Sequence, residues 1–355
     1  MKLLTVVGAR PQFVKAAVVS RAVRSRHEEV LVHTGQHYDD ALSGSFFRDL
    51  GVPAPDVNLG AGSRTAGPRM AAMIRGIAAE IRGRRPDVVI VYGDTDSTQA
   101  GALAARECGV RLAHVEAGAR SFDLRMPEEI NRIVADHLSA LALCATATAA
   151  VQLRFERACA RIEVVGDVML DACLAFAPAA RKLGVPARHS VAPGAYYAAT
   201  LHRAGNTDDP ARLTAILWAL ATLDLPVLLA CHPRTRAAIE AAALKARLAD
   251  VRLLPPLPYP EMLGLVADAK AVLTDSGGLQ REAYYLGVPC VTLREETEWV
   301  ETIASGWNRL ADADPARIRA AVLAAVPQGR APDVAAFGGG RAGERVLAAL
   351  EGLGP

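Results

Sequence analysis

The sequence predicts two α/β domains, each built on a doubly wound parallel sheet, that face each other across a central cleft. Short apolar runs alternate with helical patterns along the chain, and several runs are too continuously apolar for a sheet with one solvated face. The alternation starts again after residues 181–194, a segment that holds two Pro and two Gly. At 355 residues, the chain is also long enough for two sizeable cores.

The first series of elements defines an N-terminal domain over residues 1–180. Residues 2–7 predict a strand, and residues 11–25 predict a helix because Pro11 suits the first turn of a helix. The run VVIVY at 88–92 is apolar on both faces, so it predicts a strand in the middle of a sheet. The other expected elements are strands at 29–34, 111–115 and 140–145 and helices at 97–108 and 127–138.

The second series defines a C-terminal domain over residues 181–340. It is expected to contain a helix at 210–223 and strands, with helices between them, at 196–201, 227–231, 251–254, 271–274 and 289–293. Residues 341–352 have a helical pattern, and we expect this helix to return to the first domain.

The composition is that of an ordinary globular protein, with 51% hydrophobic and 22% charged residues. A net charge of +2 gives no reason to expect a nucleic acid or a membrane surface as a partner. The longest apolar stretch, residues 138–151, is too short to span a bilayer, and the N-terminus lacks the pattern of a signal peptide. The Cys residues stand singly without a CxxC motif, which indicates reduced thiols in a cytoplasmic protein.

Charged and small residues follow several predicted strands, at the point where each strand ends. Because the carboxyl ends of parallel strands meet at one edge of a sheet, this bias favours a ligand site there over loops that are merely polar. The segments are residues 8–12, 93–97, 116–120, 202–203, 232–234 and 276–282.

The sequence Asp275-Ser276-Gly277-Gly278 before a predicted helix is typical of a phosphate-binding turn. Glycines let a ligand approach the backbone, and the free N–H groups of a helix start face an anion. The same residues also suit a plain helix cap, so the motif alone does not define a site. Cationic donors that would suit a diphosphate are Arg10, Lys15, His202, His232 and Arg309.

Three carboxylates lie at or near one edge of the first predicted sheet: Asp94, Glu116 and Glu128. Buried carboxylates cost free energy unless they are paired, and carboxylates in different environments serve as acid and base in many enzymes. The alternative explanation for these three carboxylates is that they form structural salt bridges with Arg120 and Arg132. Glu129, beside Glu128, is explained by the dipole at the start of a helix.

Missing motifs exclude several other kinds of site. The turn after the first strand has no GxGxxG, which argues against a nicotinamide cofactor, and the chain has no GxxxxGK[ST] loop or GxSxG elbow. The HxE at 114–116 lacks the PCxxC of zinc deaminases. His33 and His37 straddle a strand end and a turn, which argues against a metal pair. Trp218 is expected in the core.

Taken together, these motifs resemble those of the non-hydrolysing UDP-N-acetylglucosamine 2-epimerases, a family with the GT-B fold of two Rossmann-like domains. The motifs occur in order over nearly the whole chain, and the ordered set is far more specific than any one of them. Matching stretches include GARPQFVKAA (8–17), TGQHYD (34–39), VYGDTDST (91–98), HVEAGARS (114–121), PEEINR (127–132), LHRAGNTDD (201–209), HPRT (232–235), DSGGLQREA (275–283) and TEWVETIASGWN (297–308).

The resemblance implies an isomerase that needs no redox cofactor and no metal. In this family the reaction removes the C2 proton and releases UDP from C1, and re-addition from the other face of C2 gives the manno epimer. By resemblance, Asp94, Glu116 and Glu128 match the acid/base carboxylates, and the sequence leaves open which of them takes the C2 proton. His202 matches a histidine near the diphosphate, where a cation would stabilise the leaving UDP.

The resemblance also implies a substrate-binding set that is spread over both domains. Glu282 would accept hydrogen bonds from the ribose, Met262 and the backbone near Leu257 align with the uracil pocket, and the Ser-Gly-Gly turn would hold phosphate. The full predicted set is Arg10, Lys15, Arg120, Arg132, His232, Met262, Ser276, Gly277, Gly278, Glu282 and Arg309. UDP-sugar and UDP are the expected ligands, and the family implies a homodimer.

One segment departs from the family pattern. Many bacterial members read His-Arg-x-Glu-Asn where this chain reads HRAGN at 202–206, so Gly205 replaces the Glu. In allosteric members this segment helps bind a second UDP-N-acetylglucosamine, together with a Gln-His pair that corresponds to Gln36 and His37. The missing carboxylate argues against such activation here.

The motifs GARPQF, TGQHYD and TEWVET resemble most the subgroup that acts on UDP-2,3-diacetamido-2,3-dideoxy-glucuronate in surface-polysaccharide pathways. The C6 carboxylate of that sugar requires a cation, for which the candidates are Arg120, Arg125 and Arg203. UDP-N-acetylglucosamine is the alternative substrate. A GT-B glycosyltransferase, a hydrolysing epimerase and a nucleotide-sugar sensor are the other hypotheses, and the intact carboxylate set argues against the first and the last.

Overall fold

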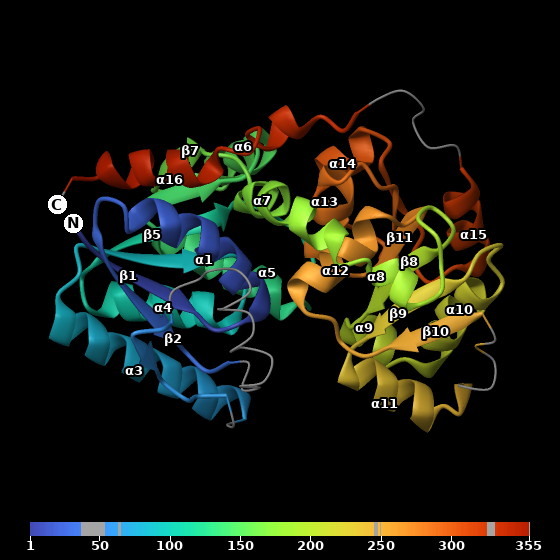
Figure 1. The fold of residues 1–355 in the computed structure, drawn as a ribbon. Coiled ribbons are helices and arrows are strands. Elements are labelled where there is room, and N and C mark those ends of the chain that lie inside the picture. The colour runs from blue at the N-terminus through green and yellow to red at the C-terminus, as the bar shows by residue number, and fades with distance from the viewer. Residues whose placement is uncertain (37–53, 63–64, 245–247, 249, 325–330, 355) are drawn as a thin grey trace. The chain divides into compact units, whose positions relative to one another are not determined.

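The computed structural model describes residues 1–36, 54–62, 65–244, 248, 250–324 and 331–354. The chain divides into two compact units, the first formed by Met1–Ala172 with Val334–Pro355 and the second by Cys173–Asp333 (Figure 1). The division falls inside helix α7 (Val168–Lys182). Each unit holds one parallel sheet, which confirms the predicted fold class.

The sheet of the first unit has seven parallel strands in the order β3-β2-β1-β4-β5-β6-β7. They are β1 (Lys2–Val7), β2 (Glu28–His33), β3 (Val57–Asn58), β4 (Val88–Tyr92), β5 (Arg111–Ala117), β6 (Leu141–Cys144) and β7 (Arg161–Val164). The strands β1 and β4 are buried along almost their whole length, as their continuous apolar sequences predict. The strand order reverses between them, and α/β sheets place ligands at the carboxyl ends of the strands at such a reversal.

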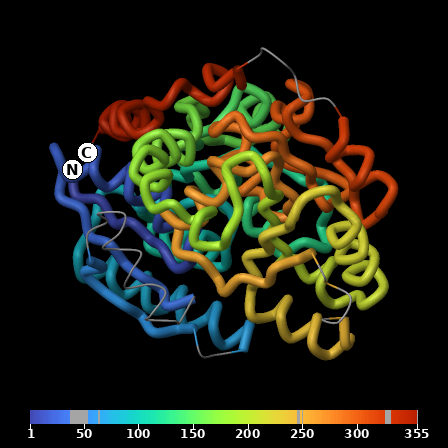
Figure 2. The backbone as a smooth tube through the Cα atoms, turned by 45° about the vertical axis from the view of Figure 1, so that its right-hand side comes forward, coloured from blue at the N-terminus to red at the C-terminus, as the bar shows by residue number. Residues whose placement is uncertain are grey.

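Helices cover both faces of this first sheet (Figure 1). They are α1 (Arg10–Val23), α3 (Ala66–Arg84), α4 (Asp96–Glu107), α5 (Pro127–Leu138), α6 (Ala147–Phe155) and α16 (Ala342–Glu351), which follows a 3-10 turn at Val334–Phe337. On one face, Met73 and Ile77 of α3 join a core with Val6 and Val91 of the sheet. Helix α16, from the end of the chain, packs against α1, and both chain ends lie on this unit (Figure 2).

The sheet of the second unit has six parallel strands in the order β10-β9-β8-β11-β12-β13. They are β8 (Tyr197–Leu201), β9 (Val227–Cys231), β10 (Val251–Leu254), β11 (Ala271–Thr274), β12 (Cys290–Thr292) and β13 (Asn308–Leu310). The order reverses between β8 and β11, so the second sheet repeats the topology of the first around its central strands.

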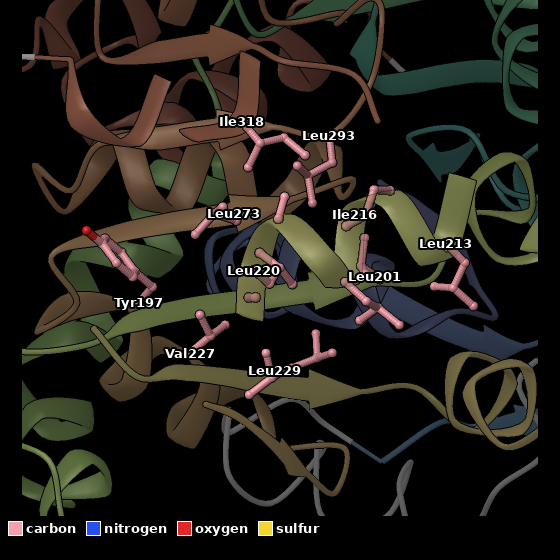
Figure 3. Packing of buried hydrophobic residues seen from close by; sticks show 14 of the residues in the cluster. Tyr197, Leu201, Leu213, Ile216, Leu220, Val227, Leu229, Leu273, Leu293 and Ile318 are labelled. Atoms are coloured by element: carbon pink, nitrogen blue, oxygen red, sulfur yellow. The ribbon is translucent and has the colours of Figure 1, made fainter. Parts of the chain in front are cut away.

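The helices of the second unit bury two apolar clusters against its sheet. They are α8 (Val185–Arg188), α9 (Ala204–Thr207), α10 (Pro210–Ala221), α11 (Pro233–Ala241), α12 (Tyr259–Ala267), α13 (Gly277–Tyr285), α14 (Val300–Ala304) and α15 (Pro315–Leu323). In one cluster, Leu220 of α10 and Ile318 of α15 pack with Leu229 and Leu273 of the strands (Figure 3). The other cluster joins α12 and α13 to the opposite face.

Every strand that the sequence predicts is present, with ends that differ by one or two residues. Three short strands were not predicted. Strand β7 is an edge strand that is half-exposed, while β3 and β13 have only two and three residues, so none of them leaves a clear apolar run. Helix α3 was also not predicted, because its sequence contains Pro and several Gly.

The prediction that Trp218 lies in the core is wrong. Its side chain is 51% exposed on the outer face of α10, and the Arg319 guanidinium lies 4.7 Å from the centre of its ring. The neighbouring Leu217 is buried, since consecutive residues of a helix point about 100° apart.

Within the described residues, no helix has both the length and the apolar character that crossing a bilayer requires. All the Cys residues are free thiols, and Cys144, Cys173, Cys231 and Cys290 are buried. Burial raises the pKa of Cys144 and of Cys290 to about 12, so these thiols stay protonated at neutral pH.

Candidate functional site

Glu116, the second-to-last residue of β5, has a backbone conformation that few residues other than glycine adopt. Its φ is 70°, and the pairing of β5 with β6 shifts register between Val115 and Ala117. A bulge of this kind turns a side chain away from the regular alternation of the strand. The left-handed conformation costs a non-glycine residue about 1–2 kcal/mol, so the rest of the site holds Glu116 in place against strain.

Lys15 of α1 forms a buried ion pair with Glu116. The distance from Lys15 Nζ to Glu116 Oε1 is 2.8 Å, and the two side chains are 4% and 7% exposed. Gly93, which follows β4, leaves room for this pair, because a Cβ at that position would lie 2.7 Å from Lys15 Nζ. Its φ of +60° also favours glycine. Two strand ends and one helix thus meet at this ion pair.

Asp94 and Arg132 form a second ion pair beside the first. Arg132, which is 5% exposed on α5, donates to Asp94 and also to Glu129 Oε2 at 3.1 Å. Asn131, the preceding residue, donates from Nδ2 to the carbonyl oxygen of Asp94 at 2.9 Å. The salt bridge that the sequence offered as the alternative for Asp94 is therefore present.

Glu129 and Glu128 are neighbours in sequence with different surroundings. Glu129 is buried and accepts hydrogen bonds from the backbone N–H groups of Ser121 and Phe122 at 2.9 and 3.1 Å, so it holds the loop after β5. The Glu128 side chain is half-buried and has no hydrogen-bond partner among the residues that the structure describes. It lies one helical turn before Arg132, on the helix that pairs with Asp94.

A buried network of side chains with alternating charge joins β5 to α5 and to the end of α6, and it was not predicted from the sequence. Asp136 Oδ1 is 2.7 Å from His114 Nδ1, and Asp136 Oδ2 is 2.7 Å from Arg120 NH1. Arg120, which is 2% exposed, also pairs with Glu156 at 2.7 Å. Burial alone would raise the pKa of Asp136, but His114 and Arg120 outweigh burial and lower it. Arg120 is thus fully engaged with protein carboxylates.

The turn after β1 is held by Gln12, another residue that sequence reasoning missed. Its Oε1 accepts from the N–H groups of Gly8 and Ala9 at 2.8 and 3.1 Å, and its Nε2 donates to the carbonyl of Tyr92 at 2.9 Å. Gln12 therefore ties the end of β1 to the end of β4. Arg10 opens α1 at this same turn and is half-buried.

In the second unit, a fully buried Asp275 organises the carboxyl end of β8. It accepts hydrogen bonds from the backbone N–H groups of His202 and Arg203 at 3.1 and 3.0 Å, and its Oδ1 lies 3.0 Å from His202 Nδ1. Burial favours a raised pKa, but the His202 imidazole and these N–H groups lower the pKa of Asp275. The His202 side chain is 43% exposed, so its ring contacts Asp275 through Nδ1 while the rest of the ring is accessible to solvent.

Helix α13 begins directly after Asp275. Ser276 Oγ accepts from the N–H of Leu279 at 3.5 Å, which is a helix cap. Gly277 is confined, since a Cβ there would lie 3.3 Å from Trp299 Nε1, whereas a Cβ on Gly278 would meet only Ser276 Oγ at 3.9 Å. The start of α13 thus presents backbone N–H groups without a bulky side chain over Gly278, as anion binding requires.

Glu282 lies one turn further along α13 and is buried. His232 lies at the carboxyl end of β9, next to β8, and caps α11 by accepting from the N–H of Arg234 at 3.2 Å. Met262 of α12 is half-buried against the apolar cluster that contains Leu257. The structure therefore places His202, His232 and Ser276 at the same edge of the second sheet.

Arg309 does not join these residues. It is exposed on β13 and lines a small cavity with Lys270 and Pro289, which precede β11 and β12, and with Ala321 and Val322 of α15. Its neighbour Asn308 points to the other face, where its Nδ2 is 3.3 Å from Gln280 Oε1 of α13. The alternation of side chains along a strand separates the two residues.

His37 lies outside the described residues. The structure therefore tests neither the predicted Gln36-His37 pair nor the prediction that His33 and His37 do not bind a metal. Among the residues that it does describe, no group of three or more His, Cys, Asp and Glu side chains is arranged to hold a metal ion.

Comparison with known proteins defines the class to which this fold and site belong. Residues 21–351 match the family described as UDP-N-acetylglucosamine 2-epimerase. The chain therefore belongs to this family of isomerases, as the sequence motifs predict.

Individual relatives agree with this assignment. The UDP-2,3-diacetamido-2,3-dideoxy-D-glucuronate 2-epimerase of Pseudomonas aeruginosa is 45% identical to the chain over 362 aligned positions, which cover 99% of this chain and 100% of that protein. The crystal structure of the Methanocaldococcus jannaschii UDP-GlcNAc 2-epimerase in complex with UDP-GlcNAc and UDP matches with a TM-score of 0.91, 36% identity and 99% coverage of both chains.

A glycosyltransferase shows the same fold with little sequence likeness. The calicheamicin glycosyltransferase matches over 100% of this chain and 99% of its own, with a TM-score of 0.56 and 16% identity. This likeness concerns the fold alone, and with the epimerase structures it confirms the expected GT-B architecture.

Proposed function

We propose that the chain is a non-hydrolysing 2-epimerase that converts UDP-2,3-diacetamido-2,3-dideoxy-D-glucuronate into its manno epimer. The observation that carries this proposal is the 45% identity, over nearly all of both chains, with the Pseudomonas aeruginosa enzyme of that name. UDP-N-acetylglucosamine is the second candidate substrate, because the archaeal enzyme with 36% identity is named for it.

In the proposed reaction, a carboxylate accepts the C2 proton while the C1–O bond breaks and its electron pair leaves with UDP. The C2–H electron pair forms a double bond between C1 and C2. UDP then adds back to C1 as a proton is delivered to the opposite face of C2. The first carboxylate ends protonated and the group on the other face ends deprotonated, and exchange of protons with solvent restores both. The sugar is neither oxidised nor reduced overall, so the reaction needs no oxidant or reductant.

Glu116 and Glu128 are suited to opposite proton transfers. The buried Lys15 ammonium favours the ionised form of Glu116, the form that accepts a proton. Glu128 has no ion-pair partner among the described residues and is proposed as the group on the other face of C2. Asp94, paired with Arg132, would complete the set. Lys15 is accordingly proposed as the partner of Glu116 rather than as a phosphate ligand.

UDP binding is proposed for the edge of the second sheet. The N–H groups of Gly277 and Gly278 would donate hydrogen bonds to a phosphate. His202, whose side chain is partly exposed, would stabilise the charge that develops on the leaving UDP. Glu282 would bind the ribose and Met262 the uracil. Arg309, which lines a separate cavity beside α15, is left out of this set.

Arg203 is proposed as the cation that recognises the C6 carboxylate. Of the three candidates, Arg120 is buried between Asp136 and Glu156, and Arg125 is 87% exposed and pairs with Asp123. Arg203 is also engaged, since its Nε donates to the carbonyl oxygen of Asp275 at 2.9 Å and its guanidinium lies 3.9 Å from Glu298, so its position rather than a lack of partners favours it. Arg203 lies beside His202, at the edge where the diphosphate is proposed to bind. Arg203→Gln should raise the KM for the uronate but not for UDP-N-acetylglucosamine. Arg125→Gln serves as the matched control and should change neither value.

A proton NMR time course in D2O, with each UDP-sugar in turn and without added NAD or metal, tests the proposed activity. Deuterium at C2 together with a manno-configured UDP-sugar supports it, and the sugar that reacts faster identifies the substrate. Accumulation of free UDP and free sugar would indicate a hydrolysing enzyme. No change in either sugar, with UDP still bound, would overturn the proposal in favour of glycosyl transfer.

A homodimer in the cytoplasm is proposed from the family alone. Light scattering on the protein as it elutes from a sizing column would give its mass directly, and a monomeric mass at the working concentration would contradict the dimer.

A further inference from the structure

His114 and Asp136 form a fully buried pair on the two elements that carry Glu116 and Glu128. His114 is on β5, two residues before Glu116, and Asp136 is on α5, the helix that carries Glu128 and Arg132. Neither side chain reaches the surface, so neither is available to touch a substrate. Any influence of these two residues on the reaction is therefore exerted through the groups to which they hydrogen-bond.

The hydrogen bonds of His114 define which atoms carry protons. Its Nε2 lies 2.7 Å from the carbonyl oxygen of Gly93, and its Nδ1 lies 2.7 Å from Asp136 Oδ1. A carbonyl oxygen only accepts, and an ionised carboxylate only accepts. Asp136 Oδ2 lies 2.7 Å from the Arg120 guanidinium and 3.2 Å from the N–H of Gly118, so the carboxylate acts as an acceptor on its other side as well. Both ring nitrogens of His114 thus face acceptors, an arrangement in which each carries a proton and the ring is an imidazolium.

This charge is balanced inside the protein. The imidazolium, Asp136, Arg120 and Glu156 alternate in sign along the network, and each neighbouring pair is 2.7 Å apart. A buried charge that is paired and hydrogen-bonded on all sides is retained, whereas an unpaired one is costly.

The pair also holds both peptide segments that carry the acid/base carboxylates. Through His114 it binds the carbonyl of Gly93, the residue before Asp94. Through Asp136 it accepts from the N–H of Gly118, two residues after Glu116, at 3.2 Å. Glu116 is strained in its bulge, so these bonds on both sides of it act directly on the position of its carboxylate.

We infer that the His114–Asp136 ion pair is a positioning device that holds the Gly93–Asp94 turn and the Glu116 bulge in the geometry required for proton transfer at C2. The inference rests on the proposed function. It concerns residues that touch neither the sugar nor UDP. A misplacement of about 1 Å at a reacting group costs about 100-fold in rate.

The test is Asp136→Asn, which keeps the size of the side chain but removes its charge. Asparagine has an N–H₂ group that donates, so His114 should give up its Nδ1 proton and become neutral. Nitrogen-15 NMR of labelled histidine should show two protonated ring nitrogens for His114 in the unmodified protein and one in the variant. Turnover should fall about 100-fold, while KM and the affinity for UDP stay close to their original values.

His137→Gln is the matched control. His137 is the next residue on α5, but it is exposed and reaches the network only at Glu156, 3.4 Å away. This variant should leave turnover and the His114 signals unchanged. If turnover fell as far in His137→Gln as in Asp136→Asn, the loss would not be specific to the His114–Asp136 pair, and the inference would be overturned.

Two further results would overturn the inference. One is a neutral His114 in the unmodified protein, and the other is full turnover by folded Asp136→Asn. Failure of the proposed function looks different, because the unmodified protein would then exchange no deuterium at C2 with either sugar while its His114 still showed both ring protons.

Discussion

The two sheets share one strand order around their central strands, yet the carboxyl edges near those strands are built from different groups. In the first unit, Glu116 and Asp94 are matched by Lys15 and Arg132, so side-chain charges face one another. In the second unit, the buried Asp275 is held largely by backbone N–H groups and by His202, which remains open to solvent. The first arrangement is suited to moving a proton, and the second to holding an anion.

This difference shows how one fold is adapted to two tasks in a single chain. Strand order and burial are alike in both units, so they do not decide the chemistry. The residues that follow each strand do, because they alone reach the edge where a ligand is accessible.

The strongest test of the comparison is Glu116→Gln in the first unit. An amide cannot accept the C2 proton, so turnover should fall about 10²–10⁴-fold. UDP affinity should persist, since the proposed UDP site lies in the second unit. Deuterium exchange at C2 and calorimetric titration with UDP measure the two effects. Loss of UDP binding with turnover retained would reverse the roles assigned to the units.

Lys15→Met tests whether the ion pair of the first unit also matters for stability. Leaving a buried Glu116 without its partner should lower the free energy of unfolding by about 3–5 kcal/mol. The double variant Lys15→Met with Glu116→Gln leaves no unpaired charge, so it should regain much of this loss. Urea unfolding of the three variants measures the coupling, and strictly additive losses would show that the two side chains do not interact.

Asp275→Asn tests the second unit, with a smaller expected effect. Its hydrogen bonds to the His202 segment weaken, which should cost about 1–3 kcal/mol. The pKa of Asp275 is lower in the folded than in the unfolded protein, so its contribution is present above the unfolded value and is lost as pH falls below about 4.

The stability of Asp275→Asn should consequently depend less on pH in that acid range than the stability of the unmodified protein. Chemical unfolding at several pH values measures the difference. Parallel pH profiles for the two proteins would show that Asp275 is not the group responsible.

The smallest expected effect concerns the buried thiols, which report on opening of each unit. Cys144 ends β6 in the first unit and Cys290 begins β12 in the second, and burial raises both pKa values to about 12. At pH 8 a thiol reagent should modify the exposed Cys159 quickly and these two only through opening of the sheet. Mass spectrometry of the labelled peptides gives each rate. Rapid labelling of Cys290 alone would show that the second unit opens more easily.

Much of the site edge could be predicted, because continuous apolar runs locate buried strands and the polar residues that follow them locate the edge. This reasoning correctly selected Asp94, Glu116 and His202 as residues at strand ends. It did not predict the pairing of Lys15 with Glu116. That contact joins residues about a hundred positions apart and depends on where α1 lies against β5.

The remaining misses have a common physical origin, which is that sequence patterns do not show what a polar side chain touches. Gln12 and Asp136 stand in helical patterns and look like ordinary polar residues. Both are buried, however, and Gln12 joins the ends of β1 and β4 while Asp136 binds the segment after β5. Arg120 was considered as a ligand for the substrate, but its guanidinium is taken by Asp136 and Glu156. Arg309 lies on β13 and lines a cavity beside α15, a contact that its sequence neighbours do not reveal.

Helix α16 gives the chain an unusual order of assembly. Asp171 binds its first N–H groups at 3.1 and 2.9 Å, and Gly343 fits so closely that a Cβ would lie 2.8 Å from Val18 of α1. During synthesis from the N-terminus, the second unit is complete before α16 emerges, while the first unit still exposes the face of α1 that α16 covers. The unit that contains the carboxylates is therefore the first to be synthesised and the last to be completed. A chain that stops before residue 342 would have a complete second unit, but its first unit would leave the α16-binding face of α1 uncovered.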